Sequence, residues 1–394
     1  MIVQIAPTPF FSDRGCHIRI EGITRCIQTL GYETVVCTYH HGNEVPGVTT
    51  QRISTIKNYT NVNAGPDKYK ILADWKLLLL CIKQFRLHQP SALHCHLHEG
   101  VLIGLTIKAL FFWKKVKIVG DIQGSLEGEL EEYGFFKKYR LLRRPVRFAE
   151  SLLFRLATRL NCSSQLSYDF ILKTHPRLEG KLNLVRDGAD RPGELTLNQS
   201  VLTRDSLGIP ANAFTIVYSG SLLESKGITE LKELIRHCKT DDKQVHFLVI
   251  GYPVEEFEEY LQVNALESLC TLTGRINFSD LPSYLKLANL AIDPKNSKSG
   301  EGSGKIMNYI ANDLPVLAFD TGSNRQYFAD RRQLMNSVDE FRSMIIDLRN
   351  NSSLLAEFAV SNSNHFENHF SWSMAARQLE NVYPQIRAAD QNSA

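Results

Sequence analysis

The sequence predicts an α/β protein in which buried parallel strands alternate with amphipathic helices. Apolar runs such as residues 2–6 and 245–251 have the length and the bounding residues of strands that are buried on both faces. Helical periodicity follows these runs, and glycine-containing loops join the elements, as at residues 293–305. With 394 residues the chain accommodates two such domains, each with its own core.

Composition argues against several classes of protein. A hydrophobic content of 43% and a charged content of 22% are typical of a soluble globular protein, and a net charge of +3 is too small to indicate nucleic-acid binding. The eight cysteines form no C-x-x-C pair, which favours buried thiols in a reducing compartment over disulfides or a zinc site. The chain opens on a strand without the features of a signal peptide, so we expect a cytoplasmic protein.

The first strand, at residues 2–6, leads into a loop that contains Arg14 and Gly15, and then into a helix and a strand at residues 34–38. The helix places its apolar residues on one face: Ile18, Ile23, Cys26, Ile27 and Leu30. In a doubly wound sheet the loop between the first strand and the first helix borders the ligand crevice. A plain turn between strand and helix explains the same residues nearly as well.

Histidines gather around the next predicted strand, at residues 92–96, which follows a leucine-rich helix within residues 65–87. His94, His96 and His98 alternate with other residues along it. Three ligands from one flat strand cannot surround a zinc ion without help from elsewhere, so we favour histidines that are structural or that contact a substrate.

Two further stretches in the first half bear on membranes. Residues 101–113 are too short to cross a bilayer, which takes about 20 residues, and are expected to form a buried helix. Residues 134–160 contain eight basic residues and one acid, Glu150, interleaved with large apolar side chains. This pattern suggests contact with an anionic membrane surface. A surface helix whose basic side chains lie along the domain would give the same pattern, and no nucleic-acid motif accompanies the charge.

The second half repeats the alternation of strands, helices and glycine-containing loops. A strand at residues 214–218 precedes a loop with Gly220, Lys226 and Gly227, and an apolar run at residues 287–292 precedes a loop rich in glycine and lysine. Free N–H groups of that loop and of the helix after it could hold an anion, for which phosphate is the natural candidate. Glycines in such a loop more often serve only to make the turn.

A family resemblance adds to this interpretation. The segments GSGKIMNYIA at residues 302–311 and LPV at residues 314–316 resemble the nucleotide-sugar site of retaining glycosyltransferases of the GT4 type, also called glycosyl transferases group 1. The resemblance spans nearly the whole chain and implies the GT-B fold, with two Rossmann-like doubly wound domains that face a cleft. It implies an acceptor-binding domain at residues 1–190, a donor-binding domain at residues 191–372, and a C-terminal helix and polar tail at residues 373–394, the helix packing back on the first domain.

The sequence departs from the family pattern at three places. The family usually has two glutamates eight positions apart, but Asn308 takes the place of the second and the first falls on Gly300, beside Glu301. Ser221 stands where an arginine usually contacts the diphosphate, and Gln123 stands where a histidine usually contacts the sugar. These departures keep open a binding or scaffolding protein that retained nucleotide affinity and lost transfer.

The resemblance also implies roles for particular residues. It makes Lys226, Glu301 and Gln123 the catalytic candidates. The donor-binding candidates are Gly220, Ser221, Lys226, Arg275, Gly302, Ser303, Gly304, Lys305 and Asn308, and the acceptor-side candidates are Arg14, Gly15, His98 and Asp121. No metal and no cofactor besides the donor is implied.

The resulting hypothesis is a retaining, metal-independent glycosyltransferase that moves a sugar from a nucleoside-diphosphate donor to a hydroxyl acceptor. The basic region favours an acceptor that is a lipid-linked or envelope polysaccharide intermediate, and a cytoplasmic protein that sits peripherally on the inner membrane. An epimerase acting on free nucleotide sugar is a third alternative, without the same segment-by-segment support.

Overall fold

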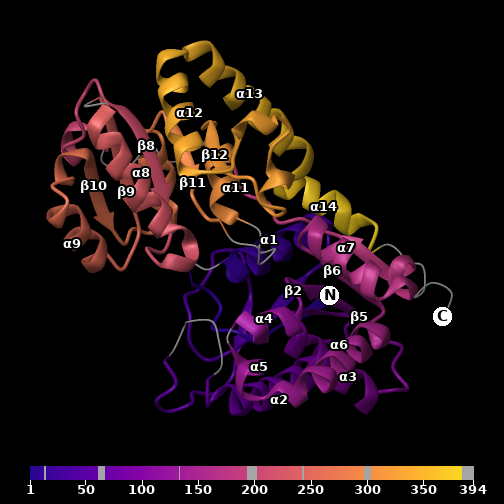
Figure 1. Cartoon of the computed structure of the whole chain (residues 1–394). Coiled ribbons are helices and arrows are strands. Elements are labelled where there is room, and N and C mark those ends of the chain that lie inside the picture. The colour runs from indigo at the N-terminus through magenta and orange to yellow at the C-terminus, as the bar shows by residue number, and fades with distance from the viewer. Residues whose placement is uncertain are drawn as a thin grey trace. The chain divides into compact units, whose positions relative to one another are not determined.

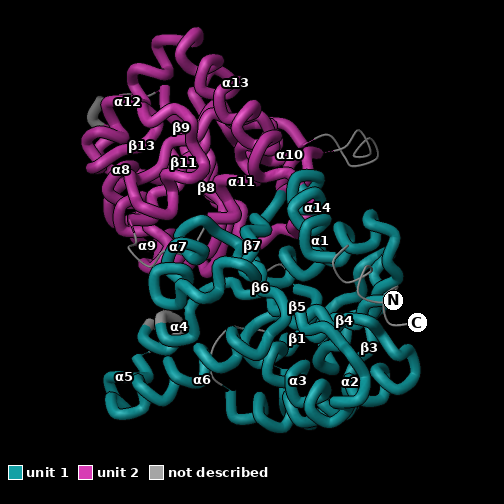
Figure 2. The backbone as a smooth tube through the Cα atoms, turned by 90° about the vertical axis from the view of Figure 1, so that its right-hand side faces the viewer, with its two compact units in different colours: residues 1–188, 372–394 teal, residues 189–371 magenta. Residues whose placement is uncertain are grey.

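The computed structural model describes residues 1–12, 15–60, 67–132, 134–192, 202–241, 244–296 and 303–383. The predicted residues Arg14, Glu301 and Gly302 lie outside these ranges. The chain forms two compact units, which Figure 2 shows in two colours: unit 1 comprises residues 1–188 and 372–394, and unit 2 comprises residues 189–371.

Unit 1 is built on a parallel sheet, whose described strands lie in the order β3-β2-β1-β4-β5-β6-β7 (Figure 1). The strands are β1 (Ile2–Ala6), β2 (Thr34–Thr38), β3 (Thr50–Arg52), β4 (Ala92–His96), β5 (Lys117–Ile122), β6 (Arg159–Cys162) and β7 (Leu182–Leu184). The strand order reverses direction between β1 and β4. Ligands of doubly wound sheets bind at the carboxyl ends of the strands at such a switch point.

Helices cover both faces of this sheet. They are α1 (Gly15–Thr29), α2 (Lys70–His88), α3 (Leu97–Leu110), α4 (Leu126–Glu132), α5 (Phe135–Lys138), α6 (Arg143–Leu156), α7 (Gln165–Thr174) and α14 (Trp372–Glu380). The core on one face joins β1 to α2 and α3 through Val3, Leu77 and Ile107, and the core on the other face joins β1 to α1 and α14 through Ile2 and Ile23. Side chains that alternate along a strand therefore enter two different cores.

Unit 2 repeats the plan with the strand order β10-β9-β8-β11-β12-β13, again entirely parallel. Its strands are β8 (Phe214–Ser219), β9 (Val245–Ile250), β10 (Cys270–Gly274), β11 (Leu290–Asp293), β12 (Val316–Phe319) and β13 (Leu334–Met335). Its helices are α8 (Ile228–Asp241), α9 (Glu255–Val263), α10 (Leu281–Leu285), α11 (Gly304–Ala311), α12 (Val338–Asn350) and α13 (Ser352–His369). The switch point lies between β8 and β11.

Two expectations about unit 1 need correction. The strand β4 ends at His96 and α3 begins at Leu97, which has a positive φ of 61°, so His98 lies on this helix and does not continue the alternation of the strand histidines. The helix expected to be buried at residues 101–113 is buried on one face only, because Leu102 and Leu110 of α3 and Trp113 beyond its end are exposed. None of the described helices is long and apolar enough to cross a membrane.

Candidate active site

Glycines follow three adjacent strands of unit 2 where the strands reach the carboxyl edge of the sheet. Gly220 follows β8, Gly251 follows β9, and Gly274 ends β10. Backbone bonds link them in a row, since Gly220 N donates to Ile250 O at 2.9 Å and Gly251 N donates to Gly274 O at 3.1 Å. A Cβ on Gly251 would stand 1.8 Å from Gly220 O, so a side chain there would break this packing. This edge of the sheet is therefore lined by backbone.

The loop that carries Lys226 is held against the end of β11. Gly227 has a φ of +87°, and a Cβ on it would lie 2.4 Å from Pro294 O, so only glycine permits this close approach. The hydroxyl of Tyr218 donates to Ser221 O at 2.9 Å and lies 3.5 Å from Lys226 O. The buried Tyr218 thus anchors the turn, and the half-buried Lys226 side chain leaves from a fixed backbone.

Lys305 lies in a buried polar cluster with Asp293 and Tyr218. Its Nζ is 3.2 Å from Asp293 Oδ1 and 3.4 Å from the Tyr218 hydroxyl, and it lies over the Tyr218 ring. Burial alone would lower the pKa of Lys305, but the fully buried Asp293 and the two nearby tyrosines outweigh burial and raise it well above its usual range. The ammonium of this predicted donor-binding residue is therefore always charged, and Asp293 already neutralises it within the unit.

Ser303 precedes α11 but does not cap it. Its Oγ donates to Asp293 Oδ2 at 2.6 Å, and no bond from this side chain reaches the first turn of the helix. Its backbone N–H donates to the Tyr327 hydroxyl at 2.8 Å. The next residue, Gly304, is exposed and has open space where a Cβ would stand. The N–H groups of the first turn of α11 thus lack the capping oxygen that a serine at this position usually supplies, and an anion could take its place.

Replacing Ser303 with alanine removes a hydrogen bond to a buried carboxylate. We expect Ser303→Ala to lower the free energy of unfolding by about 2 kcal/mol, since bonds to charged groups contribute about 1.5–3 kcal/mol. Urea unfolding followed by circular dichroism measures this change. Ser353, which is exposed and makes no hydrogen bond among the described residues, provides the control: Ser353→Ala is expected to change stability by less than about 0.5 kcal/mol. Equal effects of the two changes would contradict the cluster.

The remaining donor-side candidates lie on the same edge of unit 2. Asn308 is half-buried on α11, and its side-chain amide makes no hydrogen bond within the described part of the chain. Arg275 follows β10, is exposed, and stacks on the ring of Tyr252 with its guanidinium carbon 5.0 Å from the ring centroid. Ser221 is half-buried in the anchored turn.

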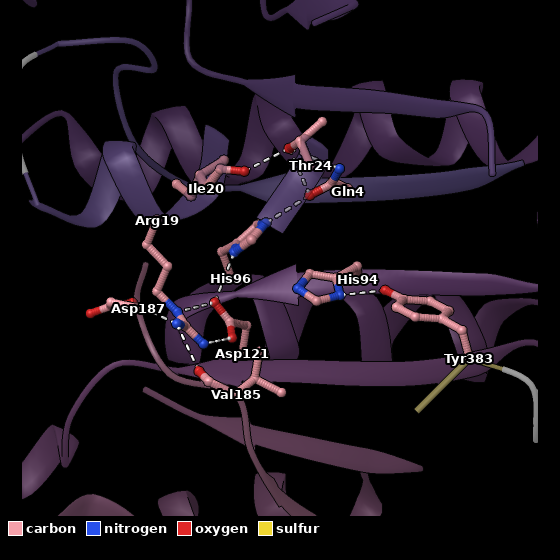
Figure 3. Close-up of polar contacts among 10 residues, drawn as sticks. All are labelled: Gln4, Arg19, Ile20, Thr24, His94, His96, Asp121, Val185, Asp187 and Tyr383. Atoms are coloured by element: carbon pink, nitrogen blue, oxygen red, sulfur yellow. Dashed lines mark hydrogen bonds and ion pairs between the residues drawn. The ribbon is translucent and has the colours of Figure 1, made fainter. Parts of the chain in front are cut away.

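In unit 1 a buried network of polar side chains lies at the carboxyl ends of β4 and β5 (Figure 3). Arg19 of α1 forms a bidentate pair with Asp121, with Nε at 2.9 Å from Oδ2 and Nη2 at 2.5 Å from Oδ1. Its Nη1 donates to Val185 O at 3.0 Å and to Asp187 at 2.6 Å. Arg19 and Asp121 are both fully buried, so this pair fixes the start of α1 to the sheet and to the segment after β7.

Two strand histidines extend the network (Figure 3). His96 lies 3.1 Å from Asp121 and 2.9 Å from the side-chain oxygen of Gln4, whose amide nitrogen donates to Thr24 of α1. Burial alone would raise the pKa of Asp121, but Arg19 and His96 outweigh it and hold the pKa below its usual range. Asp121, predicted on the acceptor side, is thus an ionised carboxylate engaged inside the unit.

The side chains of His94, His96 and Asp121 come close enough to share a metal ion, with potential ligand atoms within 4.8 Å of one another. Their bonds within the protein leave little capacity for one. Both oxygens of Asp121 bind Arg19, and the two ring nitrogens of His96 contact Gln4 and Asp121. His94 Nδ1 lies 2.6 Å from the Tyr383 hydroxyl, which leaves only its Nε2 without a partner. Apart from His94 Nε2, the potential ligand atoms of these three residues already bind other groups of the protein, so the residues do not fit a metal centre.

Burial, aided by the neighbouring His96, lowers the pKa of His94 to about 3. The unfolded value is about 6.5, so between these pKa values the unfolded chain binds a proton that the folded chain excludes. The free energy of unfolding should therefore decrease as the pH is lowered below about 6.5. Protonation of His94 in the unfolded chain should account for a decrease of about 2 kcal/mol between pH 7 and pH 5. Tryptophan fluorescence reports on unit 1, which holds all three tryptophans, Trp75, Trp113 and Trp372. In urea unfolding at both pH values, His94→Gln should lose this part of the pH dependence, and an unchanged dependence would contradict the assignment.

The other first-domain candidates have separate environments. Gly15 is the first residue of α1, with open space where a Cβ would stand. His98 is buried, with Nε2 3.1 Å from Glu150 Oε1, and the same Glu150 oxygen accepts from Leu126 N at 2.8 Å. His98 is therefore bonded within the unit. Gln123 is half-buried just beyond β5, and its amide nitrogen is buried without a hydrogen-bond partner among the described residues.

Several residues that organise these sites were missed from the sequence. Asp293 is the last residue of the apolar strand β11, and an acid at the carboxyl end of a parallel strand is a recognisable signal. Arg19 interrupts the apolar face of α1, four positions before Ile23, and such an interruption marks a charge that has to be paired inside. No local signal identifies Tyr218 as the shared anchor, because its partners lie elsewhere in the chain.

The family model described as Glycosyl transferases group 1 matches residues 202–358. No curated protein matches the sequence. Among solved structures, the sucrose-phosphate synthase of Thermosynechococcus elongatus is 15% identical, with a TM-score of 0.77 over 98% of this chain and 99% of that chain. HepE of Anabaena in complex with UDP-glucose is 16% identical, with a TM-score of 0.72 over 98% and 99% of the two chains. WaaG, a glycosyltransferase involved in lipopolysaccharide biosynthesis, is 12% identical, with a TM-score of 0.70 over 97% and 100%.

These likenesses cover nearly the whole chain, while the family match lies within unit 2, the unit that contains the glycine-lined edge and α11. The chain therefore has the GT-B fold of glycosyltransferases, and its residues 202–358 match the model of the glycosyl transferases group 1 family.

Proposed function

We propose that the protein transfers a sugar from a nucleoside-diphosphate sugar to a hydroxyl acceptor. The observation that carries the proposal is the convergence of two anion-binding elements on Tyr218 in unit 2. The Tyr218 hydroxyl lies within 3.5 Å of Lys226 O on one side and within 3.4 Å of Lys305 Nζ in the first turn of α11 on the other. The group 1 match and the HepE complex with UDP-glucose support a nucleotide sugar as the ligand.

Transfer from such a donor breaks the bond between the anomeric carbon and a phosphate oxygen, which leaves negative charge on the departing diphosphate. A fixed cation and backbone N–H groups that point at this oxygen stabilise that charge as it develops. We assign the cation to Lys226 and the N–H groups to the uncapped first turn of α11, which begins at Gly304. With these donors in place the reaction needs no metal ion.

We further propose that the sugar keeps its anomeric configuration. The acceptor oxygen bonds to the anomeric carbon on the face from which the diphosphate leaves, and its proton passes to a phosphate oxygen of the leaving group. This route needs no protein carboxylate as a base. It agrees with a site whose nearest buried acid, Asp293, is already bonded to Ser303 and Lys305.

On the acceptor side we assign Gln123 and Gly15. Both lie in unit 1 at the carboxyl edge of the sheet, Gln123 just beyond β5 and Gly15 at the start of α1. The unpartnered amide nitrogen of Gln123 is a donor suited to a sugar hydroxyl. We propose an acceptor that is a lipid-linked or envelope polysaccharide intermediate.

One alternative has a specific observation in its favour. Asn308 and Ser221 supply neutral groups where the family usually has charged ones, and Asp293 neutralises Lys305. A protein with these features could bind the donor without transferring its sugar.

A panel of nucleoside-diphosphate sugars distinguishes the two. Purified protein is incubated with each donor, with and without a membrane lipid extract, and the released nucleoside diphosphate is measured. Release from one donor that depends on the extract supports transfer and identifies the donor. Saturable donor binding without release under every condition supports the binding protein, and conversion of free donor without any acceptor would indicate an epimerase.

A further inference from the structure

We propose that one side of unit 1, formed by α2, α3, α6 and residues 111–115, docks on the surface of a bilayer that contains anionic lipids. We refer to this side as the α2–α3–α6 face. The proposal concerns a surface of unit 1 alone and does not depend on the transferase proposal, because docking is measured without any donor.

The three helices form one continuous side of the unit. The helix α3 packs against α2 and also against α6. Figures 1 and 2, which are two views turned by 90°, both place the three helices together along the lower side of unit 1. Their inward residues, such as Leu77, Ile107 and Phe154, belong to a single core, so their outward residues share one surface.

That surface is rich in large apolar side chains. On α2 the outward residues Ile71, Leu72, Trp75 and Leu79 are exposed, Ile71 by 84% of its area, although the opposite side of the same helix is already buried in the core. The turn after α3 exposes Phe112 by 78% and Trp113 by 60%. On α6 the residues Phe148, Leu152 and Leu156 recur at helical spacing and are all exposed. A helix that is apolar on both sides and an apolar patch of this extent indicate an interaction surface.

The basic residues around this patch differ in their partners. Arg143 and Arg147 of α6 pair with Glu127 of α4, which accounts for two of them. Arg144 and Arg155, on the apolar side of α6, form no ion pair within the described ranges. The same holds for the neighbouring Lys137 and Arg140. The unpaired cations thus accompany the exposed apolar side chains.

Acidic side chains on these segments are bonded inside the unit. Asp74 accepts from the Tyr39 hydroxyl at 2.5 Å, Glu99 pairs with Lys70 at 3.1 Å, and the buried Glu150 holds His98. They are the only acids of α2, α3 and residues 111–115 and 134–156. The α2–α3–α6 face therefore offers apolar and aromatic side chains surrounded by uncompensated positive charge.

This combination selects a bilayer over a second copy of the chain. Aromatic and aliphatic side chains enter the region between headgroups and acyl chains, while arginine and lysine bind anionic headgroups. A symmetric dimer through the same face would bring its unpaired arginines close to those of its partner without acids to compensate them.

Tryptophan fluorescence and vesicle co-sedimentation test the proposal. The protein is mixed with vesicles of phosphatidylcholine alone or of phosphatidylcholine with phosphatidylglycerol. We expect binding at least about tenfold stronger to the anionic vesicles. We also expect a blue shift in emission, because Trp75 and Trp113 lie on the face.

Two variants of α6 probe the two kinds of contact separately. We expect Arg144→Glu/Arg155→Glu to weaken binding to anionic vesicles by about 25-fold or more, since each basic residue near the surface contributes roughly fivefold. We expect Phe148→Ser/Leu152→Ser to weaken it by about tenfold or more. These four side chains are exposed, so the variants should fold, and unchanged urea unfolding confirms that they do.

The matched controls lie in unit 2. Lys286→Glu reverses an exposed charge and Val263→Ser removes an exposed apolar group, and each should leave binding within about twofold of the wild type. Two outcomes would overturn the proposal: a wild-type protein that does not bind anionic vesicles, and α6 variants that bind as well as the controls. A dimer in solution that the α6 variants dissociate, without vesicle binding, would assign the face to a second copy instead.

Discussion

Replacing Arg19 with methionine is expected to lower the free energy of unfolding of unit 1 by about 4 kcal/mol. Methionine has no guanidinium group, so the fully buried Asp121 loses both bonds of the bidentate pair and retains only His96. Removing one partner of a buried ion pair costs about 3–5 kcal/mol, because a charge is left in a medium that cannot solvate it. Urea unfolding followed by tryptophan fluorescence measures the loss in unit 1.

The same helix provides the control. Arg25 pairs with Glu21 at 2.8 Å on the exposed side of α1, and Arg25→Met should cost less than about 0.5 kcal/mol. The double variant Arg19→Met/Asp121→Asn should be more stable than Arg19→Met alone, since it no longer buries an unpaired carboxylate. Equal losses in Arg19→Met and Arg25→Met would show that the network does not hold the sheet edge.

The effect of Arg19 should also depend on pH. The pKa of Asp121 in the folded protein lies below its unfolded value, so its contribution is fully present above the unfolded pKa of about 3.9 and is lost as the pH falls toward the folded value. The difference in stability between wild type and Arg19→Met should therefore narrow below about pH 4.

The sequence was sufficient to predict the elements of this fold and its class. Strands at residues 2–6, 34–38 and 92–96 were predicted from apolar runs, and the structure confirms them, because strands buried on both faces leave an uninterrupted apolar signal. The family resemblance predicted the GT-B fold, which the likeness to solved structures confirms, since glycines at strand ends and the start of α11 follow one another at characteristic distances along the chain. The donor site that the same resemblance implies stays a prediction.

What the sequence could not show are contacts between distant positions. Lys305 has the same appearance in the sequence as Lys226, and only the structure shows that Asp293, a buried residue at the end of β11, pairs with Lys305. Asp121 likewise lies near the end of β5 as a free carboxylate would, but its partner Arg19 lies 102 residues away in the chain. A pattern that is local along the chain cannot reveal which charges are compensated.

Burial was the other limit. The apolar stretch at residues 101–113 was predicted to be a buried helix because its outward positions are as apolar as its inward ones. The sequence does not show that Leu102 and Trp113 are left exposed in the folded unit. The same holds for α2. Whether a side chain is exposed depends on the folding of the whole unit. The exposed apolar side chains on this side of unit 1 can therefore be identified only from the structure.

Lys226→Ala is expected to lower kcat for sugar transfer by about 10²- to 10³-fold, which corresponds to about 2.7–4 kcal/mol of transition-state stabilisation. Charge on the departing diphosphate develops during the reaction, so a cation that acts on it should affect kcat more than KM. Lys226 is half-buried in a turn whose backbone Tyr218 holds, and the alanine variant should unfold at the wild-type urea concentration.

The measurement is the steady-state release of nucleoside diphosphate from the donor that the panel identifies. The control is Lys286→Ala, which changes an exposed lysine of unit 2 and should keep full activity. Lys226→Arg, which retains the charge, should recover part of the rate. A variant Lys226→Ala that raises KM with kcat unchanged would make this lysine a residue for donor binding only, and unchanged kinetics would remove it from the site.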